Sequence, residues 1–138
     1  KEFPDAEELL ENYKPIPETD REKQFVIRMT REAVHTSLER HAGKLRYFYT
    51  ASGKKTVAEG KDLTAVQYII GTGGALTRLP GRKEILESVK TLAKEHELYP
   101  TEAAKVLIDE DYILSSLGVL SKVYLNDALQ LMKKSLRI

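Results

Sequence analysis

An apolar run that leads directly into a cluster of glycines is the feature that most limits how this chain can fold. Residues 66–70 read VQYII, and residues 71–74 continue as GTGG before an arginine, a proline and an amphipathic segment. A largely apolar strand is typical of a sheet covered on both faces, and glycine lets the backbone adopt positive φ and approach other groups closely. The pattern predicts a buried strand that turns into a helix at the carboxyl edge of a small α/β sheet, where open sheets bind ligands.

Two common phosphate-binding motifs do not explain this turn. The pattern GxGxxG fails because Leu76 stands where the third glycine belongs, and GxxxxGK[ST] has no match in the chain. A purely structural strand-to-helix turn therefore stays open as one explanation of Gly73 and Gly74.

The rest of the chain is predicted to alternate helices with short strands, without an internal repeat. Thr19 and Glu22 have the spacing of a helix-capping box. In the helix that follows, an apolar stripe is predicted to pack on the core, with His41 at its edge. The predicted elements are a helix at 5–13, a long helix from 19 to about 43, strands at 45–50 and 55–59 joined as a hairpin, a helix from about 80 to near 96, a strand at 105–108, a helix at 112–124 and a last helix capped by Asn126.

Length and composition bound the class of protein. The 138 residues suit a single domain, 1–138, in which residues 1–18 form an N-terminal helical extension and linker. A net charge of +1 does not indicate a nucleic-acid partner, and no apolar run is long enough for a membrane span. The absence of cysteine agrees with a cytoplasmic location. Because the chain begins at Lys1 rather than at methionine, we expect a fragment of a larger protein.

The glycine turn resembles a known nucleotide-binding motif. The stretch IIGTGGALTRLPG is similar to the adenosine motif of the superfamily of ATPases that includes actin, sugar kinases and heat-shock chaperones. Gly73 and Gly74 match the glycine pair, Arg78 the arginine and Pro80 the proline. The resemblance implies an α/β fold, specifically a partial ribonuclease-H-like (actin-like ATPase) C-terminal lobe with a small central sheet, flanking helices and an added β-hairpin.

Longer stretches narrow the resemblance to one branch. The sequence around the glycine turn, and the segment ELYPTEAAKVLIDEDYILSSLGVLS, look most like the accessory proteins of adenosylcobalamin-dependent glutamate (methylaspartate) mutase, which are related to hydantoinases and oxoprolinases. This resemblance implies a chaperone-like reactivating factor that uses ATP to release damaged cobalamin from its mutase. Its partners would be the mutase subunits and the missing N-terminal lobe of its own parent chain.

The resemblance also assigns residues. Thr72, Gly73, Gly74 and Ala75 would contact the nucleotide through bare backbone, and Arg78 would lie over the adenine face. One residue more than in the chaperone pattern separates the glycine pair from Arg78, so the alternative is an arginine that faces solvent. Asp111 and Asp109 precede the predicted helix at 112–124, which is rich in small residues, near where some relatives place an acid on the ribose side. Capping of that helix is the alternative role.

The chain lacks the parts that hydrolysis needs. The two phosphate hairpins of the superfamily are absent, and no set of groups for Mg²⁺ and a positioned water is recognisable, so we expect no catalytic residue and no metal site. The full-length parent would be at most a weak ATPase. Two other hypotheses stay open: an interaction module whose exposed hairpin, with aromatic residues at 47–49, binds protein, and a fragment of a hydantoinase-like or oxoprolinase-like hydrolase.

Overall fold

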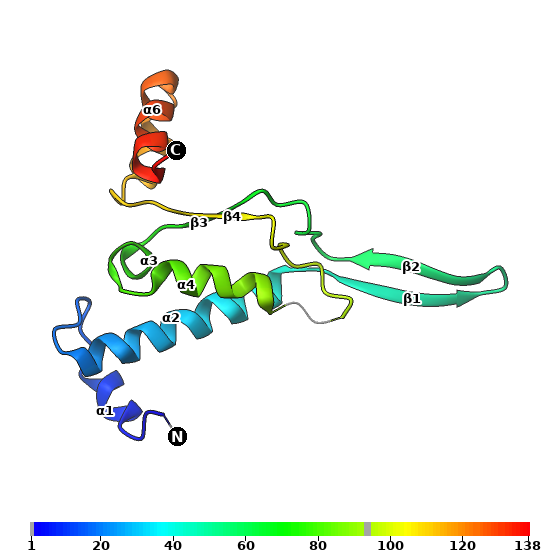
Figure 1. Ribbon diagram of the computed structural model, residues 1–138, viewed down its shortest axis with the longest axis horizontal. Helices are drawn as coiled ribbons and strands as arrows, with labels where there is room; N and C mark the ends of the chain where they lie inside the picture. Colours follow the sequence, from blue (N-terminus) through cyan, green and yellow to red (C-terminus); the bar gives the residue numbers. More distant parts are fainter. Residues whose placement is uncertain (1, 93–94) are drawn as a thin grey trace.

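The chain packs helices on one face of a two-stranded parallel sheet and extends a separate antiparallel hairpin from one end (Figure 1). The computed structural model describes residues 2–92 and 95–138. Within these residues the elements are, in order, α1 (Ala6–Glu11), α2 (Asp20–His41), β1 (Lys44–Thr50), β2 (Gly53–Glu59), β3 (Tyr68–Gly71), α3 (Gly74–Arg78), α4 (Arg82–Glu87), the 3₁₀ turn η1 (Ser88–Thr91), β4 (Lys105–Ile108), α5 (Leu114–Leu120) and α6 (Leu125–Leu136). The predicted mixed α/β domain with a small sheet, flanking helices and a hairpin is confirmed.

The core lies between the sheet and the helices α2 and α4. Strands β3 and β4 run parallel, which places Ile69 beside Val106 and Gly71 beside Ile108 on one face. The helices cover that face, as Figure 1 shows. The buried cluster and the partly buried side chains packed on it are Leu86, Val106, Ile108, Val34, Ile69 and Leu76.

The opposite face of the sheet is open. Tyr68 is 47% exposed and Ile70 is 46% exposed, although both belong to the apolar run that predicted a fully buried strand. That prediction is wrong, because helices cover only one face and the pair α5–α6 stands off the carboxyl end of β4 (Figure 1). The strand also begins at Tyr68 rather than at residue 66.

Helix α2 begins as the sequence predicts. The Thr19 hydroxyl accepts a hydrogen bond from the Glu22 amide at 3.1 Å, and the Glu22 carboxylate accepts one from the Thr19 amide at 2.8 Å. The capping box is therefore confirmed. The apolar stripe of this helix packs on the core only in part, however: Val34 contacts the buried cluster, but within α2, all of which is described, Phe25 alone is buried and His41 is exposed.

Other boundaries differ from the prediction for local reasons. The helix expected from about residue 80 begins at Arg82, because Gly81 adopts a left-handed conformation (φ 73°) as its N-cap. Its predicted end near His96 is wrong, because α4 ends at Glu87, η1 follows to Thr91, and Glu95 and His96 lie in a turn; residues 93–94 lie outside the described residues. The helix predicted at 112–124 spans only Leu114–Leu120. Tyr124, not Asn126, is the N-cap of α6, so the predicted asparagine cap is wrong.

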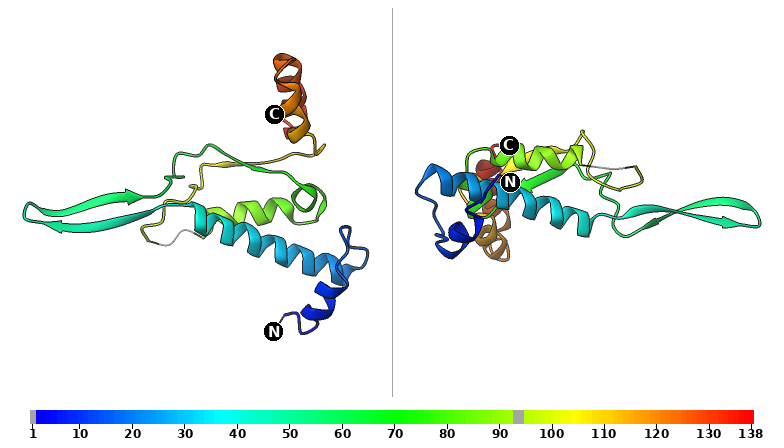
Figure 2. Two further views of the ribbon diagram at one scale, coloured as in Figure 1. Left: turned by 180° about the vertical axis from the view of Figure 1, so that it is seen from behind. Right: turned by 90° about the horizontal axis from the view of Figure 1, so that it is seen from below.

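The hairpin of β1 and β2 extends away from the rest of the molecule in all three views (Figures 1 and 2). A two-residue turn leads into Gly53, whose φ of 110° favours glycine. At the base, the Gly43 amide donates to the Lys61 carbonyl at 2.7 Å. A Cβ atom on Gly43 would lie 2.6 Å from the Glu59 carbonyl oxygen, so only glycine fits where the segments before β1 and after β2 cross.

The N-terminal segment packs on the start of α2. Arg21 donates to the Asp5 carboxylate, and the rings of Phe3 and Phe25 meet edge to face with centroids 5.3 Å apart. Among the described residues, no helix has the combination of length and apolar character that crossing a membrane requires.

Candidate functional site

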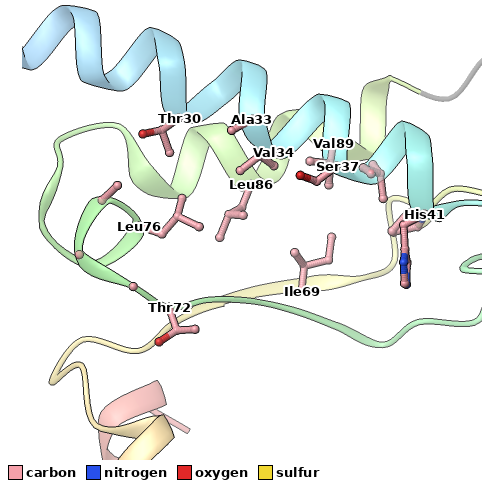
Figure 3. A pocket seen from close by; sticks show the side chains of 15 residues that line it. Thr30, Ala33, Val34, Ser37, His41, Ile69, Thr72, Leu76, Leu86 and Val89 are labelled. Atoms are coloured by element: carbon pink, nitrogen blue, oxygen red, sulfur yellow. The ribbon is translucent and has the colours of Figure 1, made fainter. Parts of the chain in front are cut away.

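An open groove of about 640 Å³ lies between α2 and the corner where β3 turns into α3 (Figure 3). One wall comes from α2, the floor from β3, and the far side from α3 and α4 (Figure 3). The lining residues are Thr30, Ala33, Val34, Ser37, Leu38, His41, Ile69, Thr72, Gly73, Gly74, Ala75, Leu76, Leu86, Val89 and Pro100. The glycine turn singled out by the sequence therefore borders this groove.

The three glycines of the turn differ in how strongly the fold requires glycine. A Cβ atom on Gly71 would lie 2.5 Å from Cδ1 of Leu86, so packing of α4 on the sheet excludes a side chain there. Gly73 has φ 91°, a conformation that other residues rarely adopt. Gly74 has no such constraint: a Cβ atom would meet nothing within 4 Å. The backbone at Gly74 is thus bare toward open space, and the fold does not itself require glycine there.

Thr77 holds the turn in one conformation. Its hydroxyl donates to the Gly73 carbonyl at 3.0 Å and lies 3.3 Å from that of Gly74, and its amide donates to Gly73 at 3.0 Å. Thr77 is itself buried. The glycine backbone is therefore fixed beside the groove before any ligand arrives.

Asp109, at the end of β4, joins the glycine turn to the C-terminal helices. Its side chain is fully buried. The carboxylate accepts hydrogen bonds from the hydroxyls of Thr72 (2.9 Å) and Ser135 (2.5 Å) and from the amides of Ile113 and Leu114 (both 3.1 Å). The carboxylate thus caps the start of α5 and fixes Thr72 and α6 relative to the sheet.

These hydrogen bonds also decide the charge of Asp109. Burial by itself raises the pKa of the carboxyl group, but two hydroxyls and two backbone amides that donate to the ionised form outweigh it. The pKa therefore lies below the ordinary value of 3.8, and the group is an ionised structural acid.

The residues predicted to bind nucleotide divide into two groups. Thr72, Gly73, Gly74 and Ala75 lie together along the groove. Arg78, the last residue of α3, is exposed and is not among the lining residues, as the solvent-facing alternative has it.

Asp111 also lies away from the groove. It is exposed and pairs with Arg137 at 3.7 Å. The capping alternative fits Asp109, whose carboxylate receives the first amides of the following helix.

The groove suits an apolar ligand better than a charged one. Its lining is mostly aliphatic, and among the described residues that form it there is no lysine or arginine. His41 Nε2 lies 3.3 Å from the Lys61 ammonium nitrogen at one end. Nothing in the described chain brings three histidine or carboxylate side chains together as a metal site would require.

Sequence reasoning missed the wall that α2 contributes. Ala33 and Ser37 continue the apolar stripe of that helix, which the sequence pattern predicts to pack on the core. Their small size is the signal: side chains this short leave a hollow between α2 and the sheet, and they line it (Figure 3).

Comparison with known proteins identifies the relatives of this chain. Residues 2–136 match the MutL protein family. The chain belongs to the MutL family. It is 36% identical over 127 residues to Protein MutL of Clostridium tetanomorphum, an alignment that covers 91% of this chain. The same alignment covers 27% of the clostridial protein, so the chain spans about a quarter of the length of this MutL relative. No solved structure matches the chain.

Proposed function

We propose that this MutL-family chain forms the adenosine-side half of an ATP-binding cleft in a reactivating factor for adenosylcobalamin-dependent glutamate mutase. In this proposal the fold is part of an actin-like, ribonuclease-H-like C-terminal lobe, and the chain itself catalyses nothing. The observation that carries the proposal is the bare backbone of Gly74 beside an open groove, where the fold does not itself demand glycine. Membership of the MutL family supports the link to the mutase.

The groove fits the nucleoside part of ATP. Aliphatic side chains of α2 and β3 would contact the faces of the purine, and the backbone at Gly73 and Gly74 would approach the ribose without steric hindrance. The phosphates find no lysine or arginine among the described lining residues. The proposal therefore assigns phosphate binding to the remainder of the parent protein, which would close over the groove.

The proposed partners follow from the same assignment. The chain would act in the cytoplasm with the mutase subunits and with the N-terminal lobe of its parent. ATP binding and exchange, with hydrolysis at most weak, would drive release of damaged cobalamin.

The variant Gly74→Val tests the nucleotide site in the full-length protein. Gly74 does not have a positive φ, a Cβ atom there would meet nothing within 4 Å, and the residue lines the groove, so we expect the variant to fold normally with its side chain beside the nucleoside site. ATP affinity, measured by isothermal titration calorimetry, should fall about tenfold or more, because the isopropyl group occupies the space of the nucleoside. Gly118→Val is the matched control, since Gly118 also lies in a helix and a Cβ atom there would meet nothing within 4 Å. The ATP affinity of this control variant should equal that of the unchanged protein.

Unchanged ATP affinity in a folded Gly74→Val protein would contradict the nucleotide site. It would favour a different function, in which the groove receives an apolar segment of another protein. The aliphatic lining, which includes no lysine or arginine among the described residues, is the observation that supports this alternative.

A further inference from the structure

The hairpin, here called the arm (residues 44–59), is a second surface that the proposed nucleotide site does not use. Its two strands pair only with each other over most of their length, from Leu45 opposite Ala58 to Thr50 opposite Gly53. Every residue of both strands is exposed except Leu45, which is half-buried. Figures 1 and 2 show that the arm extends well beyond the helices.

Only the base of the arm is tied to the rest of the molecule. The Leu45 amide donates to the His96 carbonyl at 2.7 Å, and the Tyr47 hydroxyl lies 2.9 Å from Nδ1 of His96. No described residue outside the arm hydrogen-bonds to the segment from Phe48 to Thr56 in these contacts. An isolated two-stranded hairpin is marginally stable in water, so a long arm of this kind gains most when a partner covers it.

The distal part of the arm carries large apolar side chains on both faces. Tyr49 is 81% exposed, Phe48 52% and Val57 49%. Successive residues of a strand face opposite sides, so Phe48 and Val57 lie on one face and Tyr49 on the other. Aromatic side chains that stay exposed in this way are enriched at protein interfaces.

The charge of the arm indicates the chemistry of its partner. Residues 46–57 include Arg46, Lys54 and Lys55 and no aspartate or glutamate, in a chain whose net charge is only +1. Two arms brought together would place like charges opposite each other, which disfavours a second copy as the partner. Arg46 is bonded to Glu59, and the Lys54 ammonium lies 3.5 Å from the centre of the Tyr47 ring. Cations held in this way beside apolar side chains suit a protein surface better than a run of phosphates.

We propose that the arm docks into an apolar depression bordered by carboxylates on a partner protein. The partner is the glutamate mutase of the proposed function, and this identity rests on that proposal. Tyr49 and Phe48 supply the buried contacts, and Lys54 and Lys55 meet acidic side chains at the rim. Beyond the contacts at its base, the described strands of the arm pair only with each other, so their outer edges can pair with an exposed strand of the partner.

The test measures binding of the complete gene product to purified glutamate mutase subunits by surface plasmon resonance. The paired substitution Phe48→Ser with Tyr49→Ser, and separately Lys54→Glu with Lys55→Glu, should each weaken binding about tenfold or more. The charge effect should diminish at high salt. The matched control is Lys133→Glu with Lys134→Glu, an adjacent exposed lysine pair on α6, which should bind as the unchanged protein does.

The outcomes separate this inference from the function on which it rests. If the unchanged protein binds the mutase and both arm variants bind equally well, the arm inference is wrong while the function stands. If the unchanged protein does not bind the mutase, the proposed function fails and the arm loses its assigned partner.

Three further results would also overturn the inference. Loss of self-association in the arm variants, seen by sedimentation, would identify a second copy as the partner. Arm-dependent binding to a 30-base-pair DNA duplex would identify nucleic acid. A large drop in Tm of the arm variants would show that the arm packs within its own protein.

Discussion

At the scale of single residues, Asp109 and Asp111 lie two positions apart after β4 but in opposite environments. Asp109 is fully buried and joined to four donors, whereas the side chain of Asp111 is exposed and lies 3.7 Å from that of Arg137. A buried carboxylate is retained only where hydrogen bonds replace its lost hydration. Asp109 meets that condition, and it thereby links the groove to α5 and α6.

The variant Asp109→Ala should lower the free energy of unfolding by about 3 kcal/mol or more, because buried amides and hydroxyls lose their acceptor. Urea unfolding followed by circular dichroism measures the change. Asp111→Ala is the control, and its exposed ion pair should contribute less than about 1 kcal/mol. Equal effects of the two substitutions would contradict the structural role of Asp109.

The same comparison has a defined pH dependence. The pKa of Asp109 is lower in the folded protein than its ordinary value of 3.8. Its stabilisation is therefore complete above that ordinary value and is lost as the pH falls through the folded pKa. The stability difference between the unchanged protein and Asp109→Ala should shrink below about pH 4.

At the scale of elements, the sequence predicts the start of α2 well but not the role of its apolar stripe as a groove wall. Its start is predictable, because the residues of the capping box are three apart and interact locally. Its groove-facing stripe is not predictable in the same way, because an apolar stripe beside a hollow has the same period as one beside a packed core. The hollow depends on what lies opposite, which is set by Ile69 and Leu86 from later segments.

Thr19→Ala should lower the free energy of unfolding by about 1 kcal/mol, since the Glu22 amide loses its acceptor at the start of the helix. Thermal unfolding measures the effect. Thr19→Ser keeps the hydroxyl and should restore most of the stability. A Thr19→Ala protein as stable as the original would mean that the N-terminal segment, through Arg21 and Asp5, fixes the helix without its cap.

The candidate site shows the same division between local and distant information. Gly73, Gly74 and their neighbours are contiguous, so the sequence identifies the turn and its edge of the sheet. The network of Asp109 is different, because Thr72 and Ser135 lie 37 and 26 residues away along the chain. No spacing rule connects them. The position of Arg78 depends on the short helix α3, which is too brief to produce a periodic pattern.

At the scale of the whole molecule, some surfaces of the described chain are packed against other elements and others are left exposed. One face of the sheet packs on α2 and α4, the other exposes Tyr68 and Ile70, and the arm is exposed along its length. Parallel sheets are normally covered on both faces. Under the proposed function, the remainder of the parent lobe covers the open face.

This unevenness predicts a gradient of hydrogen exchange. Backbone amides of residues 46–57 should exchange at least about a hundredfold faster than those in the middle of α2, because the arm has few contacts beyond its own pairing. Hydrogen–deuterium exchange with mass spectrometry measures both segments in one sample. Equal protection would indicate that a second molecule covers the arm in solution. Addition of the mutase should slow exchange in the arm if it is the docking surface.

The crossing at Gly43 gives the molecule a mechanical property. Helix α2 ends at His41 and β1 begins at Lys44, so one nearly unbroken span joins the groove wall to the tip of the hairpin. Gly43 and Gly60 touch at the junction with no side chain between them, which leaves no slack there. We therefore expect a displacement of the arm at Tyr49 to reach the part of α2 that carries Ser37 through this glycine crossing.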